Sequence, residues 1–156
     1  MSGLNEQVAS HESVPFANDV AFLQCTPLLN DGATTESFFG LLEGSEAKAL
    51  VIIGYASGSI PRILNPYITK TVERGVPAFV LSDNKANDTG PQEIKYIGQK
   101  ESVESGATIL KDVNINHIVD VAVSIQGAID EGMSGTELTQ AVIEKYGSTS
   151  WAYFKP

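Results

Sequence analysis

One stretch limits the fold more than any other, because it predicts a strand, a turn, a helix and a strand in a row. Residues 49–53, ALVII, are all apolar, which is typical of a strand covered on both faces in a parallel sheet. After a glycine-bearing turn at 54–61, apolar residues within 63–72 repeat at helical spacing, and Gly75 is a natural helix stop. Residues 77–82 predict the second strand. This unit is typical of α/β proteins.

The remaining apolar patterns continue the alternation of strand and helix. They predict strands at 20–25 and 107–110, and helices at 36–42, 113–131 and 136–146. Strands that alternate with helices favour a parallel sheet joined by right-handed crossovers. We therefore predict a Rossmann-like α/β fold of three layers, in which helices flank a mostly parallel four-stranded sheet.

The chain has the size of a single domain, with 156 residues of which 42% are hydrophobic. Residues 1–18 lack an apolar pattern, so we expect a flexible arm there and a folded domain at 19–147. Residues 148–156 form an aromatic tail with Trp151, Tyr153 and Phe154. Three aromatic side chains are costly to leave in water. The tail is expected to fold back on the domain or to pack on a second subunit.

Charge and composition exclude several classes of partner. The net charge of −9 disfavours nucleic acid, and no apolar run approaches the roughly 20 residues of a membrane span. Cys25 is the only cysteine, so no internal disulfide forms, and its apolar strand predicts a buried, unreactive thiol. No spacing of metal-ligand residues stands out, so we expect no metal site. The first residues lack the parts of a secretory signal, which favours the cytoplasm.

The turn at 54–61 is the candidate binding loop. Tyr55, Ser57, Gly58 and Ser59 follow a parallel strand, where α/β proteins commonly bind ligands, and the N–H groups of a following helix favour a carboxylate. Asp83, after the next strand, is expected at the same edge of the sheet. The alternative is a plain tight turn that begins a helix, with Asp83 as a turn cap.

A dinucleotide site has a similar outline, but its motif is not met. Gly54 and Gly58 are four residues apart without the third glycine of G-x-G-x-x-G, and no G-K-[ST] follows. We expect no cofactor.

Several motifs occur in an order that matches a known family. Residues 54–61 are GYASGSIP, residues 73–82 are ERGVPAFVLS, and residues 19–23, DVAFL, precede a Thr-Pro pair. Together they resemble the C-terminal half of the bacterial L-asparaginase/glutaminase family, which has a Gly-x-Gly-Asn-x-Pro loop, a helix and a Gly-Val-Pro-Val-Val-x-x-Ser strand. The family also tends to have Gly, Tyr and Gly at the places of Gly90, Tyr96 and Gly106. The resemblance covers about residues 19–147.

The resemblance implies that the family's chemistry lies in a half that is missing from this sequence. There a threonine attacks the side-chain amide of asparagine, helped by a second threonine, a lysine and an aspartate in Thr-Gly-Gly-Thr and Gly-Thr-Asp-Thr segments. Neither segment occurs here, and the nearest imitations, Thr34-Thr35 and Thr89-Gly90, lack the neighbouring residues. An activated threonine needs a base within reach, so we predict no catalytic residue in this chain.

The loop itself departs from the family pattern at two positions. In the family, its asparagine reaches towards the substrate's amino group in a neighbouring subunit. Ser59 replaces this asparagine, and Ala56 replaces the first glycine. A serine hydroxyl can accept a hydrogen bond but does not offer the paired donor and acceptor of an amide. Both departures indicate that the loop does not keep its family role.

These observations predict a stand-alone asparaginase C-terminal-like domain that is not catalytic by itself. Because intact relatives assemble through this half, we expect a homo-oligomer, with a dimer as the first expectation. Small amino acids such as Asn, Asp or Gln are the first ligands to test. The alternative is the C-terminal part of an L-asparaginase whose catalytic threonine half is a separate chain or is absent from this sequence.

Overall fold

The computed structural model describes residues 19–149, which contain one four-stranded parallel sheet. The strand order β1-β2-β3-β4 is also their order along the chain. The strands are β1 Val20–Gln24, β2 Ala49–Gly54, β3 Ala78–Ser82 and β4 Thr108–Ile109. The predicted α/β class with a four-stranded sheet is confirmed, and the sheet is wholly parallel.

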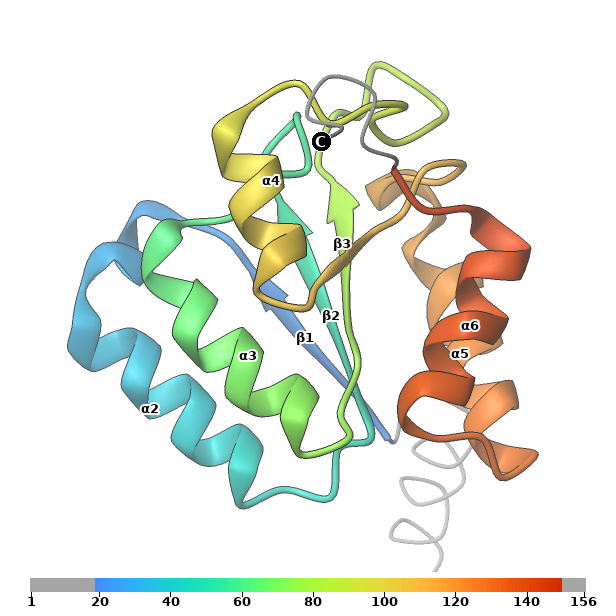
Figure 1. Cartoon of the computed structure of the whole chain (residues 1–156), viewed down its shortest axis with the longest axis horizontal. Coiled ribbons are helices and arrows are strands. Elements are labelled where there is room, and N and C mark those ends of the chain that lie inside the picture. Colours follow the sequence, from blue (N-terminus) through green and yellow to red (C-terminus); the bar gives the residue numbers. More distant parts are fainter. Residues whose placement is uncertain (1–18, 150–156) are drawn as a thin grey trace, which may run out of the picture.

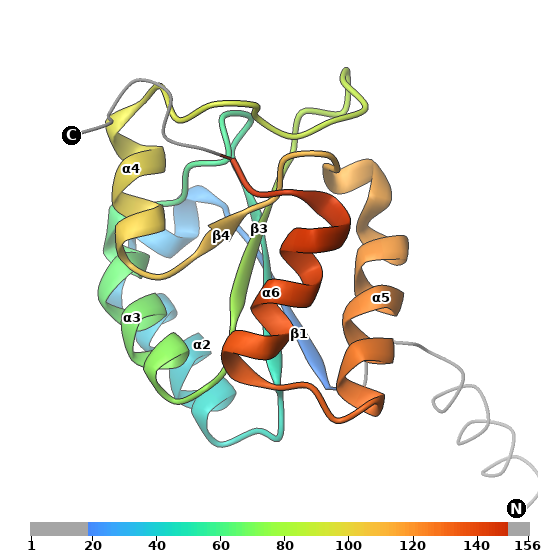
Figure 2. The same cartoon turned by 45° about the vertical axis from the view of Figure 1, so that its right-hand side comes forward.

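Helices cover both faces of this sheet. They are α2 Gly32–Glu43, α3 Asn65–Glu73, α4 Ile97–Glu104, α5 Ile118–Asp130 and α6 Gly135–Tyr146, together with the short 3-10 helices η1 Pro27–Asn30, η2 Arg62–Leu64 and η3 Ile115–His117. The three crossover helices α2, α3 and α4 lie on one side of the sheet, and α5 and α6 lie on the other (Figures 1 and 2). Because the strand order advances in one direction, crossovers of one hand must all fall on one face.

The central strand β2 is buried on both faces and divides the core in two. Its odd-numbered residues Val51 and Ile53 share a core with α5 and α6, whereas Leu50 and Ile52 share a core with α2 and α3. All six residues of β2 are buried. A strand between two helical layers has apolar side chains on both of its faces, so its sequence is expected to be apolar throughout.

Some boundaries differ from the sequence expectations. Helix α2 begins at Gly32 rather than at residue 36, because the Asp31 carboxylate accepts a hydrogen bond from the N–H of Ala33 at 3.1 Å and caps the helix. The predicted helix 113–131 is a 3-10 turn followed by α5. Helix α4 was not predicted at all, since its sequence, IGQKESVE, has no clear apolar stripe.

A buried asparagine holds the loop that follows β3. The side chain of Asn114, which is fully buried, donates to the carbonyl oxygens of Asn84, Asn87 and Thr89. Its own oxygen accepts from the N–H of Asn116 at 2.9 Å. The loop therefore has a fixed path from the end of β3 towards α4, although it contains no helix or strand.

No helix in residues 19–149 is long and apolar enough to cross a membrane.

Two glycines provide a matched test of this packing. An added Cβ at Gly90 would lie 2.2 Å from the carbonyl oxygen of Leu110, whereas one at Gly40, within α2, would meet nothing within 4 Å. We expect Gly90→Ala to lower the free energy of unfolding by about 1–3 kcal/mol, because backbone must move. Gly40→Ala is expected to raise it by about 0.5–1 kcal/mol through helix propensity. Urea unfolding measures both, and a neutral Gly90→Ala would contradict the close approach.

Candidate functional site

The candidate site lies at the carboxyl ends of three neighbouring strands. Cys25 follows β1, Tyr55 follows β2 and Asp83 follows β3. Parallel strands end at one edge of their sheet, so these residues meet where α/β proteins commonly bind ligands.

The loop 55–59 is closed by its own hydrogen bonds. The N–H of Tyr55 donates to the carbonyl of Ser59 at 2.9 Å, and the N–H of Gly58 donates to the carbonyl of Tyr55 at 2.7 Å. Gly58 has φ +80°, and a Cβ there would lie 2.8 Å from Ile109 and 2.9 Å from Pro91. Glycine is therefore required at this position for two reasons, conformation and space.

Two side chains outside the loop hold two more of its carbonyl groups. The hydroxyl of Ser82 donates to the carbonyl of Ala56 at 2.7 Å. The side-chain amide of Gln99, which is 1% exposed, donates to the carbonyl of Ser57 at 2.6 Å. The oxygen of that amide accepts from the N–H groups of Lys95 and Tyr96 at 2.7 and 2.9 Å. One buried side chain thus joins the loop to the beginning of α4.

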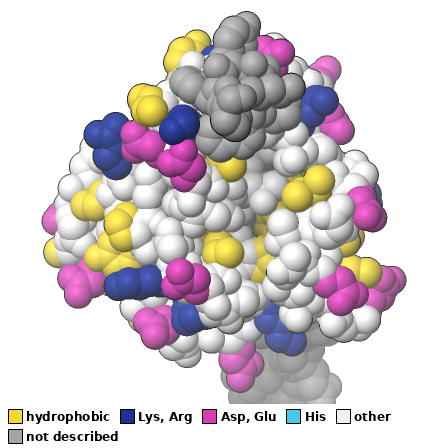
Figure 3. All heavy atoms as spheres, viewed as in Figure 1, with side chains coloured by type: hydrophobic (Ala, Val, Ile, Leu, Met, Phe, Trp, Pro, Cys, Tyr) yellow, Lys and Arg dark blue, Asp and Glu magenta, His cyan; other side chains and the backbone are white. Residues whose placement is uncertain are grey.

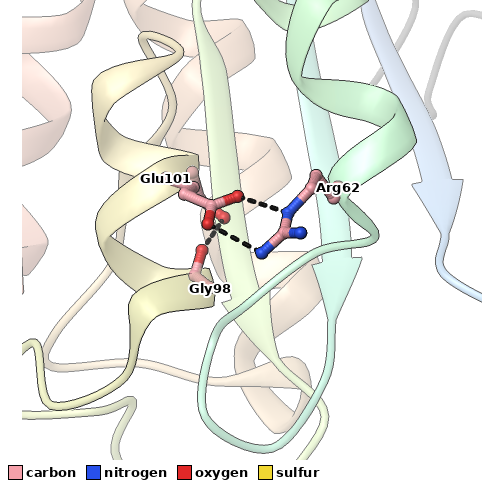
Figure 4. A network of polar contacts seen from close by, with 4 residues as sticks. Arg62, Gly98 and Glu101 are labelled. Atoms are coloured by element: carbon pink, nitrogen blue, oxygen red, sulfur yellow. Dashed lines mark hydrogen bonds and ion pairs between the residues drawn. The ribbon is translucent and has the colours of Figure 1, made fainter.

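Helix α4 is also fastened to the segment that follows the loop. The guanidinium of Arg62 donates to both carboxylate oxygens of Glu101, at 2.7 and 2.9 Å (Figure 4). An exposed pair of this kind adds little stability, but its two-point geometry fixes orientation. Side chains of both charges lie next to one another in this part of the surface (Figure 3). Gly98 approaches the loop closely, since a Cβ there would lie 3.1 Å from the Cβ of Ser59.

The loop and the start of α4 line an open depression of about 600 Å³, which we call the loop depression. It is lined by Tyr55, Ala56, Ser57, Ser59, Tyr96 and Gly98. The hydroxyl oxygens of Ser57 and Ser59 are 2.8 Å apart and share a hydrogen bond. Of the candidate residues, Tyr55, Ser57 and Ser59 thus line one surface. Gly58 is buried and shapes the loop without lining the depression, and Asp83 is exposed and outside the lining.

The electrostatics of this edge disfavour anions. Burial raises the pKa of Tyr55, and the Coulombic effects of Cys25 in its ionised form and of Asp83 raise it further. Burial, with a smaller effect of Asp83, raises the pKa of Cys25 to about 12. The Cys25 thiol is therefore protonated at neutral pH and is a poor nucleophile. The sequence predicted an unreactive thiol that is buried, whereas the structure leaves Cys25 half-buried. Hydroxyl groups and the Asp83 carboxylate remain as the polar groups of the edge.

The sequence did not identify Tyr96 and Gln99 as parts of the site. Tyr96 matches the family pattern without being marked as a site residue, and both lie about 40 residues after the loop, at the start of α4, which has no clear apolar stripe. A buried glutamine in a polar helix carries no sequence signal of its own.

The threonines Thr34 and Thr35, which imitate the family's catalytic segments in sequence, have structural roles. The hydroxyl of Thr35 is buried and donates to the carbonyl of Leu29 at 2.7 Å, and that of Thr34 donates to the Asp31 carboxylate at 3.2 Å. Among residues 19–149 no three His, Cys, Asp or Glu side chains are grouped as metal ligands.

The comparison with solved structures supports the fold. No protein-family model matches, and no curated protein matches in sequence. Among solved structures, L-asparaginase I from Vibrio cholerae matches with a TM-score of 0.63 and 15% identity over 80% of this chain and 35% of its own. The thermostable L-asparaginase from Thermococcus kodakarensis matches with a TM-score of 0.61 and 17% identity over 86% of this chain and 39% of its own. The chain thus has an asparaginase-like fold and spans little more than a third of those enzymes.

Gln99→Leu tests whether the buried amide holds the loop. It leaves the carbonyl of Ser57 and the N–H groups of Lys95 and Tyr96 without this partner, so we expect the free energy of unfolding to fall by about 1–3 kcal/mol. Amide hydrogen exchange at residues 57–59 and 95–96 should accelerate. The control is Gln140→Leu on the exposed side of α6, where a change within about 0.5 kcal/mol is expected. Equal effects of the two variants would refute the role of Gln99.

Proposed function

We propose that the domain binds a small amino acid, such as Asn, Asp or Gln, in the loop depression and does not hydrolyse it. The observation that carries this proposal is the pair of hydroxyl groups of Ser57 and Ser59, 2.8 Å apart on a rigid loop at the carboxyl edge of the sheet. A preformed loop loses little conformational freedom on binding, which favours recognition of a small ligand.

The chemistry of the depression suits the ligand's ammonium group better than its carboxylate. The N–H groups of Tyr55, Gly58 and Ser59 donate within the loop, so they are engaged before any ligand arrives. Serine and tyrosine hydroxyl oxygens accept hydrogen bonds from an ammonium, and the nearby Asp83 carboxylate attracts it. In this arrangement Ser59 takes over, with a hydroxyl, the contact that the resemblance assigns to the family's asparagine.

The absence of hydrolysis follows from what surrounds the hydroxyl groups. Serine or threonine attacks an amide only when a neighbouring base accepts its proton. Ser57 and Ser59 hydrogen bond to each other, and no histidine, lysine or carboxylate lines the depression formed by the described residues.

As part of the same proposal, the domain also assembles with a second copy, and the apolar surface of Phe22, Ile118, Val119 and Ala122 is available for contacts.

Titration calorimetry with Ser59→Ala tests the ligand proposal. We expect binding of at least one of Asn, Asp and Gln to the intact chain, and a Kd about 10- to 150-fold weaker in the variant, since a hydrogen bond to a charged group is worth about 1.5–3 kcal/mol. Ser37→Ala, on the exposed surface of α2, should bind like the unchanged protein. Absence of heat with all three amino acids at millimolar concentration would remove the proposal.

A second candidate function follows from the small share of the two solved enzymes that this chain matches. Because the chain matches only 35% and 39% of their length, it also fits the non-catalytic part of an L-asparaginase whose threonine half is a separate polypeptide. The two candidates differ in what completes the site.

Activity of paired chains separates these candidates. If a neighbouring gene encodes Thr-Gly-Gly-Thr and Gly-Thr-Asp-Thr segments, the second candidate predicts that the two chains purified together release ammonia from asparagine. This chain alone should release none, because it supplies no base to a nucleophile. Ammonia release by this chain alone would contradict both candidates, and an inactive pair would eliminate the second.

A further inference from the structure

We propose that a hollow between α5 and the last turn of α6 binds a free α-amino acid with an apolar side chain. The two helices lie side by side on one face of the sheet (Figure 2), and the hollow has a volume of about 400 Å³. Its lining includes His117, Asp120, Val123, Ser124, Lys145 and Tyr146. None of these residues lines the loop depression, so this is a second site that does not depend on the proposed function.

A chain of hydrogen bonds fixes the lysine of this hollow. The hydroxyl of Tyr146 donates to the carbonyl of Asp120 at 3.1 Å, and its oxygen lies 2.7 Å from the hydroxyl oxygen of Ser124. Because the tyrosine proton is used, Ser124 donates to Tyr146, and the Lys145 ammonium donates to Ser124 at 2.8 Å. The ammonium also lies 5.5 Å from the centroid of the Tyr146 ring. A charged group held in this way loses little freedom when a ligand binds.

The direction of this chain argues against a nucleophilic serine. A serine hydroxyl attacks a substrate only when a neighbouring base accepts its proton. The proton of Ser124 is directed to the Tyr146 hydroxyl, and its oxygen accepts from the Lys145 ammonium, which has no lone pair to take a proton. The cluster is therefore suited to binding rather than to covalent chemistry.

Two opposite charges face the hollow without neutralising each other. Within residues 19–149, Asp120 and Lys145 form no ion pair with each other. A ligand that carries both an ammonium and a carboxylate satisfies both side chains. A lone anion is disfavoured, because it would meet the Asp120 carboxylate and a chain with a net charge of −9. The charges of the hollow thus favour a zwitterion.

The spacing of the two charges matches an α-amino acid. Asp120 and Ser124 lie at positions i and i+4 of α5 and so share one face of the helix. Asp120 is therefore about 6 Å along the axis from the serine that holds Lys145. The charged ends of an α-amino acid are about 3 Å apart, and a hydrogen bond of about 2.8 Å at each end lets it bridge this distance.

A neighbouring hollow on the other side of Lys145 suits this ligand less well. It has a volume of about 290 Å³, it is also lined by Ser124, Lys145 and Tyr146, and its acidic residue is Glu131. Glu131 comes seven residues after Ser124, about 10.5 Å along the helix axis. Its carboxylate is farther from Lys145 than one amino acid spans, so Glu131 provides a matched control for Asp120.

The rest of the hollow suits an apolar side chain. Most of its exposed surface is apolar, and Val123, which is 46% exposed, lies on the same face of α5 as Asp120. Covering apolar surface is favourable by roughly 25 cal/mol per Å². Leucine, isoleucine and valine therefore fit this hollow better than Asn, Asp and Gln, the ligands proposed for the loop depression.

Amide NMR of the full-length chain titrated with L-leucine locates the site. We expect the signals of residues 120–124 and 145–146 to shift at millimolar leucine, while those of residues 55–59 in the loop depression stay in place. Leucinamide lacks the carboxylate and N-acetyl-leucine lacks the ammonium. Each should bind about three- to tenfold more weakly than leucine, since one exposed charge contact is lost.

Two substitutions assign the ends of the ligand. In Lys145→Met, leucine and leucinamide should bind with equal Kd, because the carboxylate has lost its partner. In Asp120→Asn, leucine and N-acetyl-leucine should bind equally. Glu131→Gln in the neighbouring hollow and Lys70→Met on the exposed surface of α3 should keep the full preference for leucine. A purely structural role of Lys145 or Asp120 would not change the preference for one analogue alone.

Several results would overturn the proposal. One is the absence of shifts at residues 120–124 and 145–146 with millimolar leucine, and another is shifts at residues 55–59 alone. A preference for leucine that survives both Lys145→Met and Asp120→Asn would refute the roles of the two charges. Loss of the preference in Glu131→Gln but not in Asp120→Asn would assign the ligand to the neighbouring hollow. The loop depression has its own signals, so failure of this site and failure of the proposed function remain distinguishable.

Discussion

The candidate site depends on one buried side-chain amide, that of Gln99. Its nitrogen holds the loop after β2, and its oxygen holds the two residues that begin α4, so elements separated by some 40 residues share a single fixed point. Glycines complete the contact, because Gly58 and Gly98 let backbone approach where a side chain would intervene. The shape of the depression is therefore set by hydrogen bonds within the chain, which form without a ligand.

The fold was predictable where apolar runs are long and unbroken. Residues 49–53 and 77–82 mark β2 and β3 because central parallel strands are buried on both faces. Helix α4 escaped prediction because Gln99 and Ser102 provide its buried face, and polar residues at those positions look like surface positions in a sequence. What stabilises them is visible only after the chain has folded, since their partners are backbone groups of other segments.

Part of the site was also predictable from the sequence. Tyr55, Ser57 and Ser59 follow one another along the chain, so a strand end followed by a turn was enough to bring them together. Tyr96 comes from another crossover connection, and no spacing rule links it to the loop. The structure also explains why Ala56 can stand where the family motif has a glycine. No residue other than glycine in 19–149 has positive φ, so Ala56 has no backbone strain.

The order of the strands has a consequence for the behaviour of the protein in concentrated solution. At the β4 edge, Ser148 bridges to Leu110 and Thr149 donates to Ile109, so the chain shields that margin itself. Within residues 19–149, β1 pairs on one side only, and its sequence, VAFLQ, contains neither charge nor proline. Charged residues and proline in an edge strand usually prevent it from pairing with a strand of another molecule. Intermolecular sheet growth, as in the first step of aggregation, would therefore begin at β1.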